Sequence, residues 1–323
     1  MRAIIPAAGL GERLRPLTLH KPKVLLPVAG KPIIGHIYDR LLALGIDEVT
    51  VIIGHLGDMV REYSQRNYPL KFHFVEQTEQ RGLGHAVGLG LDDNPEPVLI
   101  ILGDTILDLD YFSLIRRTTN VIGVMPVEDP RRFGVVLLEN GRVMRLIEKP
   151  SEPISKQAIA GIYLIQNGRI LRDAIDYIVT QDIRTKNEYQ LTDALQVMLT
   201  WGEQFGITSI ENCFDCGTPE TLLATNRALL QRQRTEYNFP GCKITAPVYI
   251  ASDAFVENST IGPYVSLSNG ARVRDSSIVD SIIDEAATIT NSQLERALVA
   301  AHSVLEGKID RPKLSDNANE KSI

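Results

Sequence analysis

The chain has 323 residues, a length that suggests one large domain and one smaller one. With 44% hydrophobic and 23% charged residues, its composition is typical of a globular protein. Its formal net charge of −6 excludes a protein whose whole surface binds nucleic acid, because such binding needs an excess of Lys and Arg.

Three cysteines, Cys213, Cys216 and Cys242, are too few for a disulfide framework. We expect Cys213 and Cys216 to be small buried residues flanking Asp215, although their C-x-x-C spacing leaves a redox or zinc pair as the alternative.

No signal-peptide pattern is present at the N-terminus, and no run reaches the roughly 18 apolar residues that a membrane helix needs. We therefore expect a cytoplasmic protein without a membrane segment.

Up to about residue 236 the sequence alternates between strand-like apolar runs and segments with helical spacing. This alternation predicts an α/β fold, a Rossmann-like and mostly parallel sheet with helices on both faces. Ligands of such sheets bind beyond the carboxyl ends of the strands, where Gly9, the LGD at 102–104 and the EKP at 148–150 fall. The predicted strands are 2–7, 48–55, 70–77 and 97–104, and the predicted helices are 33–46, 57–67 and 84–92.

After residue 240 helical periodicity ends, and aliphatic residues recur mostly every five or six positions with small and polar residues between them. This spacing is typical of hexapeptide repeats, whose triangular coils stack and bury one aliphatic column per side. An irregular β-rich tail is the alternative. We predict a first domain over 1–236, a β-helix over 241–308 and a disordered polar tail over 309–323. The aliphatic positions are Ile244, Ile250, Val256, Ile261, Leu267, Val273, Ile278, Ile283, Ile289, Leu294, Val299 and Val304.

The stretch AAGLGERLRPLT, residues 7–18, combines a glycine pair with two arginines just after the first predicted strand, and KPKVLLP follows at 21–27. Glycines let a backbone approach an anion, Arg13 can contact two phosphate oxygens, and Lys23 adds a point charge. The stretch has neither the P-loop motif nor the third glycine of a dinucleotide site. Taken alone, it is also compatible with a surface turn carrying solvated arginines.

Together with KPKVLLPVAGKP, this stretch resembles the N-terminal signature of the sugar-phosphate nucleotidyltransferases. The resemblance continues in order through EQTEQRGLGHA at 76–86, LGD at 102–104, the stretch 129–150, NEYQLTDALQ at 187–196 and FDCGTPE at 214–220. The chain most resembles the long-form glucose-1-phosphate thymidylyltransferases, because residues 258–278 look like their C-terminal left-handed β-helix.

The resemblance implies that a sugar 1-phosphate attacks the α-phosphate of a nucleoside triphosphate directly and that pyrophosphate leaves. Asp104 and Asp215 would bind Mg²⁺. The implied catalytic residues are Arg13, Lys23 and Lys149; the nucleotide would contact Ala8, Gly9, Gly11, Gln77 and Gly82; the sugar phosphate would contact Gly134, Glu148, Lys149, Ile159, Tyr163 and Glu188.

Several of these residues also have structural interpretations. Glu148 and Glu188 are compatible with ordinary surface acids, and Tyr163 lies in a run that reads as a core strand. Among the histidines, His85 lies beside the base-binding turn, where it would reach the nucleotide.

Two positions depart from the family pattern. Glu12 replaces the usual Thr, and a carboxylate beside a triphosphate must face away or pair with a cation such as Arg15. Val24 replaces the Gln of many thymidylyltransferases and makes the stretch more similar to uridylyl and guanylyl relatives.

We expect dTTP and glucose 1-phosphate as substrates, with UTP–glucose-1-phosphate uridylyltransferase or mannose-1-phosphate guanylyltransferase as alternatives. Two other classes stay open: a bifunctional relative that also transfers acetyl groups, for which His302 is the candidate, and a regulatory subunit without activity. No nucleic-acid or membrane partner is expected. Stacked coils expose strand edges, so we expect the β-helix to pair subunits of a homo-oligomer.

Overall fold

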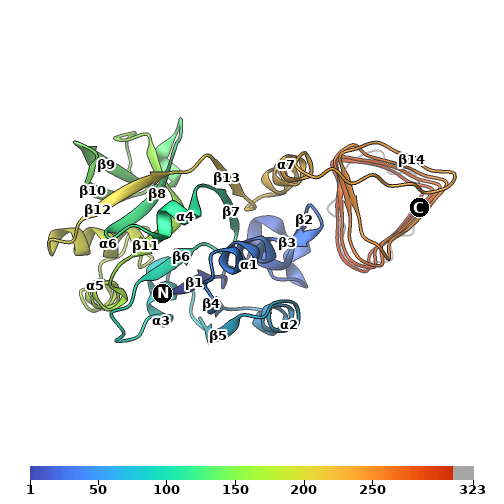
Figure 1. Cartoon of the computed structure of the whole chain (residues 1–323). Coiled ribbons are helices and arrows are strands. Elements are labelled where there is room, and N and C mark those ends of the chain that lie inside the picture. Colours follow the sequence, from blue (N-terminus) through green and yellow to red (C-terminus); the bar gives the residue numbers. More distant parts are fainter. Residues whose placement is uncertain (308–323) are drawn as a thin grey trace. The chain divides into compact units, whose positions relative to one another are not determined.

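The computed structural model describes residues 1–307, which form two compact units (Figure 1). Unit 1 consists of Met1–Gly9 and Ile37–Cys213, and unit 2 contains residues 10–36 and the described residues from Phe214 onwards. The predicted tail over 309–323 lies outside the described residues, as does residue 308 of the predicted β-helix. The predicted domain limits stay a prediction.

Unit 1 is built around a nine-stranded sheet whose order is β10-β9-β11-β6-β1-β4-β5, with β8 and β12 joined to it through β11. Strands β6, β1, β4 and β5 run parallel, and β11 lies antiparallel beside β6. This arrangement confirms the predicted α/β fold with a mostly parallel centre. The strands of unit 1 are β1 (Arg2–Pro6), β4 (Glu48–Ile53), β5 (Lys71–Glu76), β6 (Val98–Ile101), β7 (Thr105–Asp108), β8 (Asn120–Pro126), β9 (Gly134–Glu139), β10 (Arg142–Glu148), β11 (Gln157–Ile165) and β12 (Phe205–Ser209). Strand β13 (Asn212–Asp215), which pairs with β7, begins in unit 1 and ends in unit 2.

Helices cover both faces of the sheet, because the central strands are apolar on both sides. In β1, Ala3, Ile4 and Ile5 are all fully buried. On one face of the sheet, Ile4 packs in a core with α3, α5 and α6. On the opposite face, Tyr38 of α1 contacts Phe72 of β5. The helices are α1 (Ile33–Ala43), α2 (Gly57–Asn67), α3 (Leu83–Leu89), α4 (Tyr111–Ile115), α5 (Gly168–Thr180) and α6 (Leu191–Thr200), with a 3₁₀ turn η4 (Pro130–Arg132).

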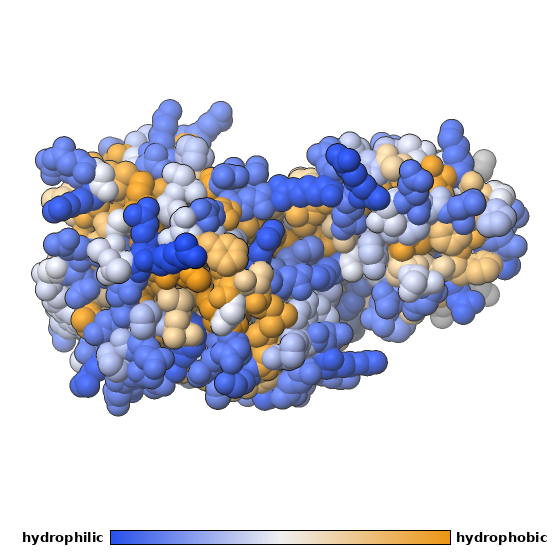
Figure 2. Space-filling view, viewed as in Figure 1, coloured by the Kyte–Doolittle hydropathy of each residue, from blue (hydrophilic) through white to orange (hydrophobic). Residues whose placement is uncertain are grey.

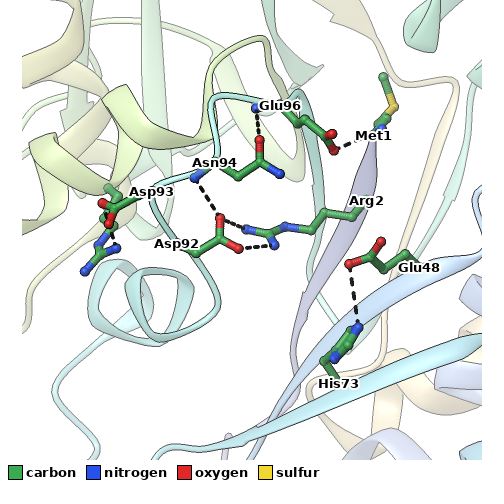
Figure 3. Close-up of polar contacts among 9 residues, drawn as sticks. Met1, Arg2, Glu48, His73, Asp92, Asp93, Asn94 and Glu96 are labelled. Carbon is green, nitrogen blue, oxygen red and sulfur yellow. Dashed lines mark hydrogen bonds and ion pairs between the residues drawn. The ribbon is translucent and has the colours of Figure 1, made fainter.

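Ion pairs hold the amino end of β1, as Figure 3 shows. The Arg2 guanidinium donates two hydrogen bonds of 2.7 Å to the two oxygens of Asp92, and these bonds lower the pKa of that carboxyl. The first strand is therefore anchored at the end opposite the glycine-rich stretch, which follows its carboxyl end.

Unit 2 begins with the N-terminal signature, which folds as three short 3₁₀ turns and a small hairpin. These elements are η1 (Glu12–Leu14), η2 (Leu17–Leu19), η3 (Lys23–Leu25), β2 (Pro27–Val28) and β3 (Lys31–Pro32). The chain returns to this unit at α7 (Pro219–Leu230), whose first turn is capped by Thr218.

The remainder of unit 2 is a β-helix of short parallel strands in three stacks, seen end-on as a triangle in Figure 1. The predicted columns are in register, since Ile244, Ile261, Ile278 and Leu294 lie side by side. The strands are β14 (Lys243–Ile244), β15 (Val248–Ile250), β16 (Phe255–Glu257), β17 (Thr260–Ile261), β18 (Val265–Leu267), β19 (Arg272–Arg274), β20 (Ser277–Val279), β21 (Ile282–Ile283), β22 (Thr288–Thr290), β23 (Gln293–Glu295), β24 (Leu298–Val299) and β25 (Val304–Glu306).

The last predicted column position is wrong by one residue. Leu305, and not Val304, pairs with Ile289 and points inward, while Val304 is 51% exposed. Neighbouring residues of a strand face opposite sides, so a shift of one residue exchanges inside and outside.

Hydrophilic residues cover most of the molecular face shown in Figure 2, with smaller apolar areas among them. Within residues 1–307, no helix is both long and apolar enough to cross a lipid bilayer.

Candidate active site

The predicted site residues are distributed over both units. Unit 1 carries Ala8, Gly9, Gln77, Gly82, Asp104, Gly134, Glu148, Lys149, Ile159, Tyr163 and Glu188, and unit 2 carries Gly11, Arg13, Lys23 and Asp215.

The predicted base-binding stretch is a turn organised by Gln77. This side chain is buried, and its Nε2 donates to the Gly82 carbonyl at 3.3 Å and to Nδ1 of His85 at 3.1 Å. An amide nitrogen only donates, so Nδ1 of His85 accepts and the ring is neutral there. Burial, and then the charge of Arg81, lower the pKa of His85 and so favour this neutral form.

Two glycines bring this turn against the predicted sugar-binding segment. A Cβ on Gly82 or Gly84 would lie 2.6 or 2.9 Å from the Tyr189 carbonyl oxygen, which is closer than real Cβ atoms approach. The Gly84 N–H donates to that oxygen at 2.8 Å, and the Tyr189 N–H donates to the Arg81 carbonyl at 2.9 Å. The two motifs therefore interlock through backbone hydrogen bonds. Glycine is needed at 82 and 84 because a side chain there would prevent this close packing.

Glu148 lies at the centre of a polar cluster at the end of β10. Its side chain is 9% exposed, its Oε2 accepts a 2.7 Å hydrogen bond from Oγ1 of Thr192, and its Oε1 lies 3.5 Å from Nζ of Lys149. A Cβ on Gly134 would lie 2.8 Å from Oε2 of Glu148. The interpretation of Glu148 as an ordinary surface acid is therefore wrong.

Lys149 adopts a backbone conformation that is uncommon for a lysine. Its φ is +44°, in the left-handed region, and its N–H donates to the Phe133 carbonyl at 2.9 Å. The hydrogen bond to Phe133, which precedes β9, and the ion pair to Glu148 together hold the ammonium group beside the cluster.

Two polar residues in the first turn of α6, Thr192 and Asp193, were not predicted as site residues from the sequence. Oδ2 of Asp193 is buried and has no hydrogen-bond partner among residues 1–307. Burial raises the pKa of this carboxyl, a hydrogen bond from Thr185 opposes the rise, and the charge of Glu148 adds to it. The signal available in the sequence was the Thr-Asp pair at a helix start within the quoted stretch 187–196.

Ile159 and Tyr163 flank a bulge in β11 and belong to the apolar core. The bulge needs Gly161, whose φ is +83° and whose Cβ would meet Leu102 at 2.9 Å. Burial raises the pKa of the Tyr163 hydroxyl above its usual range, with a smaller contribution from Glu148. The core interpretation of Tyr163 is thus confirmed, and contact with a sugar stays a prediction.

Glu188 is exposed on a tight turn. Its N–H donates to the Thr185 carbonyl at 3.2 Å and its carbonyl accepts from the Thr185 N–H at 3.0 Å, while its Oε2 accepts from Nε2 of Gln190 at 2.8 Å. The carboxylate is therefore fixed in direction although it faces solvent.

Two loops follow the carboxyl ends of β1 and β6. Nε2 of Gln80 donates to the Ala8 carbonyl at 3.0 Å, and a Cβ on Gly9 would meet no atom within 4 Å. Asp104 follows Gly103, which packs on the backbone of β1 and donates to the Pro6 carbonyl at 3.0 Å. Oγ1 of Thr105 donates to Oδ1 of Asp104 at 3.1 Å.

In unit 2, Gly11 is the residue that shapes the signature turn. Its φ is +63°, and a Cβ there would lie 2.9 Å from Thr18 and 3.1 Å from the Cβ of Lys23. Arg13 is exposed one turn later. The close contact places Lys23 directly against the glycine turn.

The two departures from the family pattern have structural explanations. Oε1 of Glu12 lies 3.6 Å from the Arg15 guanidinium, so the predicted compensating ion pair is confirmed. Val24 is 3% exposed and packs in the interior of unit 2.

Asp215 ends β13 and is exposed. A Cβ on Gly217 would lie 2.9 Å from its Oδ1, so the glycine of the FDCGTPE stretch leaves room for the carboxylate. Neither of the flanking residues Cys213 and Cys216 forms a disulfide within residues 1–307; Cys216 is buried as expected, whereas Cys213 is only partly buried. Within residues 1–307 no group of three or more His, Cys, Asp or Glu residues could hold a metal ion, and the two-aspartate magnesium site stays a prediction.

Comparison with known proteins gives the family. The nucleotidyl transferase family model matches residues 2–232. A bifunctional protein GlmU from Methanocaldococcus jannaschii is 33% identical over 262 residues, which are 81% of this chain; the chain spans 61% of the length of that relative. A glucose-1-phosphate thymidylyltransferase from Streptomyces griseus is 28% identical over 94% of this chain and 92% of its own.

Among solved structures, a putative glucose-1-phosphate thymidylyltransferase from Bacillus anthracis in complex with a sucrose is 28% identical, with a TM-score of 0.61. The match covers 73% of this chain and 98% of that one. Because the family model matches well over half of the chain, this chain belongs to the nucleotidyl transferase family.

Proposed function

We propose that this protein transfers a nucleotidyl group from a nucleoside triphosphate to a hexose 1-phosphate and releases pyrophosphate, with dTTP and glucose 1-phosphate as the first candidates. The observation that carries the proposal is the backbone interlock of the predicted base turn with the predicted sugar segment, Gly84 N–H to Tyr189 carbonyl at 2.8 Å. The family match and the thymidylyltransferase relatives support the same reaction.

In the proposed reaction the protein positions the two substrates and neutralises the negative charge of their phosphates. Two polyanions must approach each other, so cations are needed on both. Arg13 and Lys23 would offset charge on the triphosphate and on the leaving pyrophosphate, and Lys149 would hold the sugar 1-phosphate. Glu148, fixed by Thr192, would accept a hydrogen bond from a sugar hydroxyl.

The donors proposed for Mg²⁺ fit that ion chemically. Asp104 and Asp215 supply carboxylate oxygens, which Mg²⁺ prefers, and the glycine at 217 leaves space beside the second carboxylate. When bound, Mg²⁺ would neutralise phosphate charge and orient phosphate oxygens.

Pyrophosphate release with Mg²⁺ tests the proposal. Five nucleoside triphosphates, dTTP, UTP, GTP, ATP and CTP, are each paired with glucose, galactose, mannose and N-acetylglucosamine 1-phosphates. Preference for dTTP with glucose 1-phosphate is the expected result. Preference for UTP or GTP would keep the proposed reaction and assign another base. The absence of pyrophosphate release by folded protein with every substrate pair would contradict the proposed reaction and favour a regulatory subunit.

We also propose a cytoplasmic homo-oligomer paired through the β-helix. Light scattering on the purified chain tests the assembly, and a monomer at micromolar concentration would contradict it.

A further inference from the structure

Lys21, the first lysine of the KPK stretch, is held by the β-helix. Its Nζ lies 2.7 Å from Oδ2 of Asp284, and the two side chains are only 16% and 8% exposed. Oδ1 of Asp284 accepts a 2.7 Å hydrogen bond from the Glu285 N–H, so both carboxylate oxygens are used. A pair this well buried and bonded holds its partners in one geometry, unlike an exposed surface pair.

The link from Lys21 to Lys23 is short and stiff. Pro22 stands between them, and its ring fixes its own φ, here −56°. The 3₁₀ turn that follows is closed by the Leu25 N–H on the Pro22 carbonyl at 2.9 Å. Lys23 in turn packs against Gly11. The position of Lys21 therefore determines where Lys23 and the glycine turn lie.

A second attachment joins the same segment to the β-helix through Asn226 of α7. This amide is fully buried; its Oδ1 accepts from the Ala29 N–H at 2.8 Å and from Oγ of Ser266 at 2.7 Å, and its Nδ2 donates to the Tyr264 carbonyl at 3.2 Å. Hairpin, helix and β-helix thus share one polar group. Truncating it would leave buried partners unpaired.

The hairpin turn also receives an aromatic ring from the β-helix. Gly30 has φ +85°, and a Cβ there would lie 2.5 Å from ring atoms of Tyr249. Only glycine allows the ring to lie on the turn. The N-terminal signature is therefore packed on the β-helix as well as bonded to it.

We propose that the β-helix positions the nucleotide-binding turn, with Asp284 as a positioning residue that fixes Lys23 through Lys21. The role of Lys23 toward the triphosphate rests on the proposed function. The packing of the turn on the β-helix does not depend on it. This role is separate from the assembly role expected from the sequence.

The test substitutes Asp284→Asn, which keeps the shape but leaves the buried ammonium without a counter-charge. Asp280→Asn is the matched control, because Asp280 pairs with Arg227 of α7 and so attaches the same β-helix without touching the signature turn. We expect a fall in kcat of about 10- to 100-fold for Asp284→Asn, since small displacements of charged groups are costly, and less than about 2-fold for Asp280→Asn.

A second readout separates positioning from general stability. Hydrogen exchange of residues 10–32, measured without substrates, should accelerate in Asp284→Asn and stay as in the wild type in Asp280→Asn. A Lys21→Gln, Asp284→Asn double variant should be no worse in kcat than Asp284→Asn alone, because both changes break one pair. If Asp284→Asn does not fold, Lys21→Gln breaks the same pair from the other side.

Equal kcat and equal exchange in the two aspartate variants would overturn the proposal, since the β-helix would then contribute stability alone. If the wild type itself turns over no substrate pair, the proposed function fails. The exchange comparison still decides whether Asp284 holds the turn.

Discussion

At the scale of single residues, the two glycines of the signature turn differ in their surroundings. Gly9→Ala should leave the melting temperature unchanged, because a Cβ there meets no atom within 4 Å, and should raise the KM for the nucleoside triphosphate if phosphate approaches that backbone. Gly11→Ala is the contrasting variant, with a stability loss of about 1 kcal/mol or more from its positive φ and the contact with Thr18. If both variants change the KM and the melting temperature equally, the assignment of Gly9 to phosphate binding and of Gly11 to the shape of the turn is wrong.

The proposed metal ligand Asp104 has a matched control six residues along the chain. Asp104→Asn should abolish Mg²⁺-dependent turnover while the protein stays folded, because an amide binds Mg²⁺ far more weakly than a carboxylate. Asp110 caps α4 through the Ser113 N–H at 3.0 Å, and asparagine caps as well, so Asp110→Asn should keep activity and stability. Normal turnover in Asp104→Asn would remove this residue from the site.

The lowered pKa of His85 predicts a pH dependence of stability. In the unfolded chain the imidazole takes up a proton near the ordinary histidine pKa of about 6.5, whereas in the folded protein it resists protonation until lower pH. The unfolded state thus binds more protons in that window, so stability falls as pH drops below about 7. His85→Asn keeps an acceptor for Gln77 without the titration, and its melting temperature should fall less between pH 7.5 and 5.5, roughly the titration range of histidine. Parallel melting curves across that range would contradict the assignment.

At the scale of elements, one hydrogen bond joins β10 and α6 at the proposed sugar side of the candidate site. Thr192→Val keeps the shape and removes the donor to Glu148, so the KM for sugar 1-phosphate should rise about 10-fold, as for loss of a hydrogen bond to a charged group. The KM for nucleotide should stay the same.

Thr200 supplies the control for this prediction. It ends the same helix, is exposed, and donates from Oγ1 to the Val197 carbonyl, so Thr200→Val should leave both KM values unchanged. If Thr192→Val raises both KM values alike, the hydroxyl supports the helix and not the sugar site.

Periodic elements could be predicted from the sequence, because their signal is local. The alternation of strands and helices gave the parallel centre of unit 1, and the aliphatic columns gave the β-helix register. Val304 failed because the spacing within a coil alternates irregularly between five and six residues: Leu305 lies six positions after Val299, and its step from Ile289 equals that from Val273 to Ile289.

Contacts between distant positions could not be predicted in this way. Thr192 lies 44 positions from Glu148, and Lys21 lies 263 positions from Asp284. In neither pair does the local sequence around one residue indicate that the other residue will contact it. The motifs therefore gave the candidate residues, while the side chains that orient them emerged only from the fold.

At the scale of the whole molecule, unit 2 joins the N-terminal signature to the β-helix although most of unit 1 separates them in the chain. Binding is reciprocal: if the β-helix holds the nucleotide turn, nucleotide on the turn must stabilise the β-helix. At about 100 times the Kd, the available stabilisation is about 2.7 kcal/mol.

Hydrogen exchange with and without Mg²⁺ and the preferred nucleoside triphosphate measures this coupling. We expect slower exchange over residues 262–286, which carry the contacts to Asn226 and Lys21, and a smaller slowing over 298–307. The effect on the last coil should be smaller because each coil of a solenoid contacts only its neighbours, and this coil is reached only through its pairing with residues 282–286. In Asp284→Asn the protection of 262–286 should shrink while that of residues 10–32 persists at saturating nucleotide. Protection that ends at the signature turn in the wild-type protein would show that the β-helix and the nucleotide turn are energetically independent.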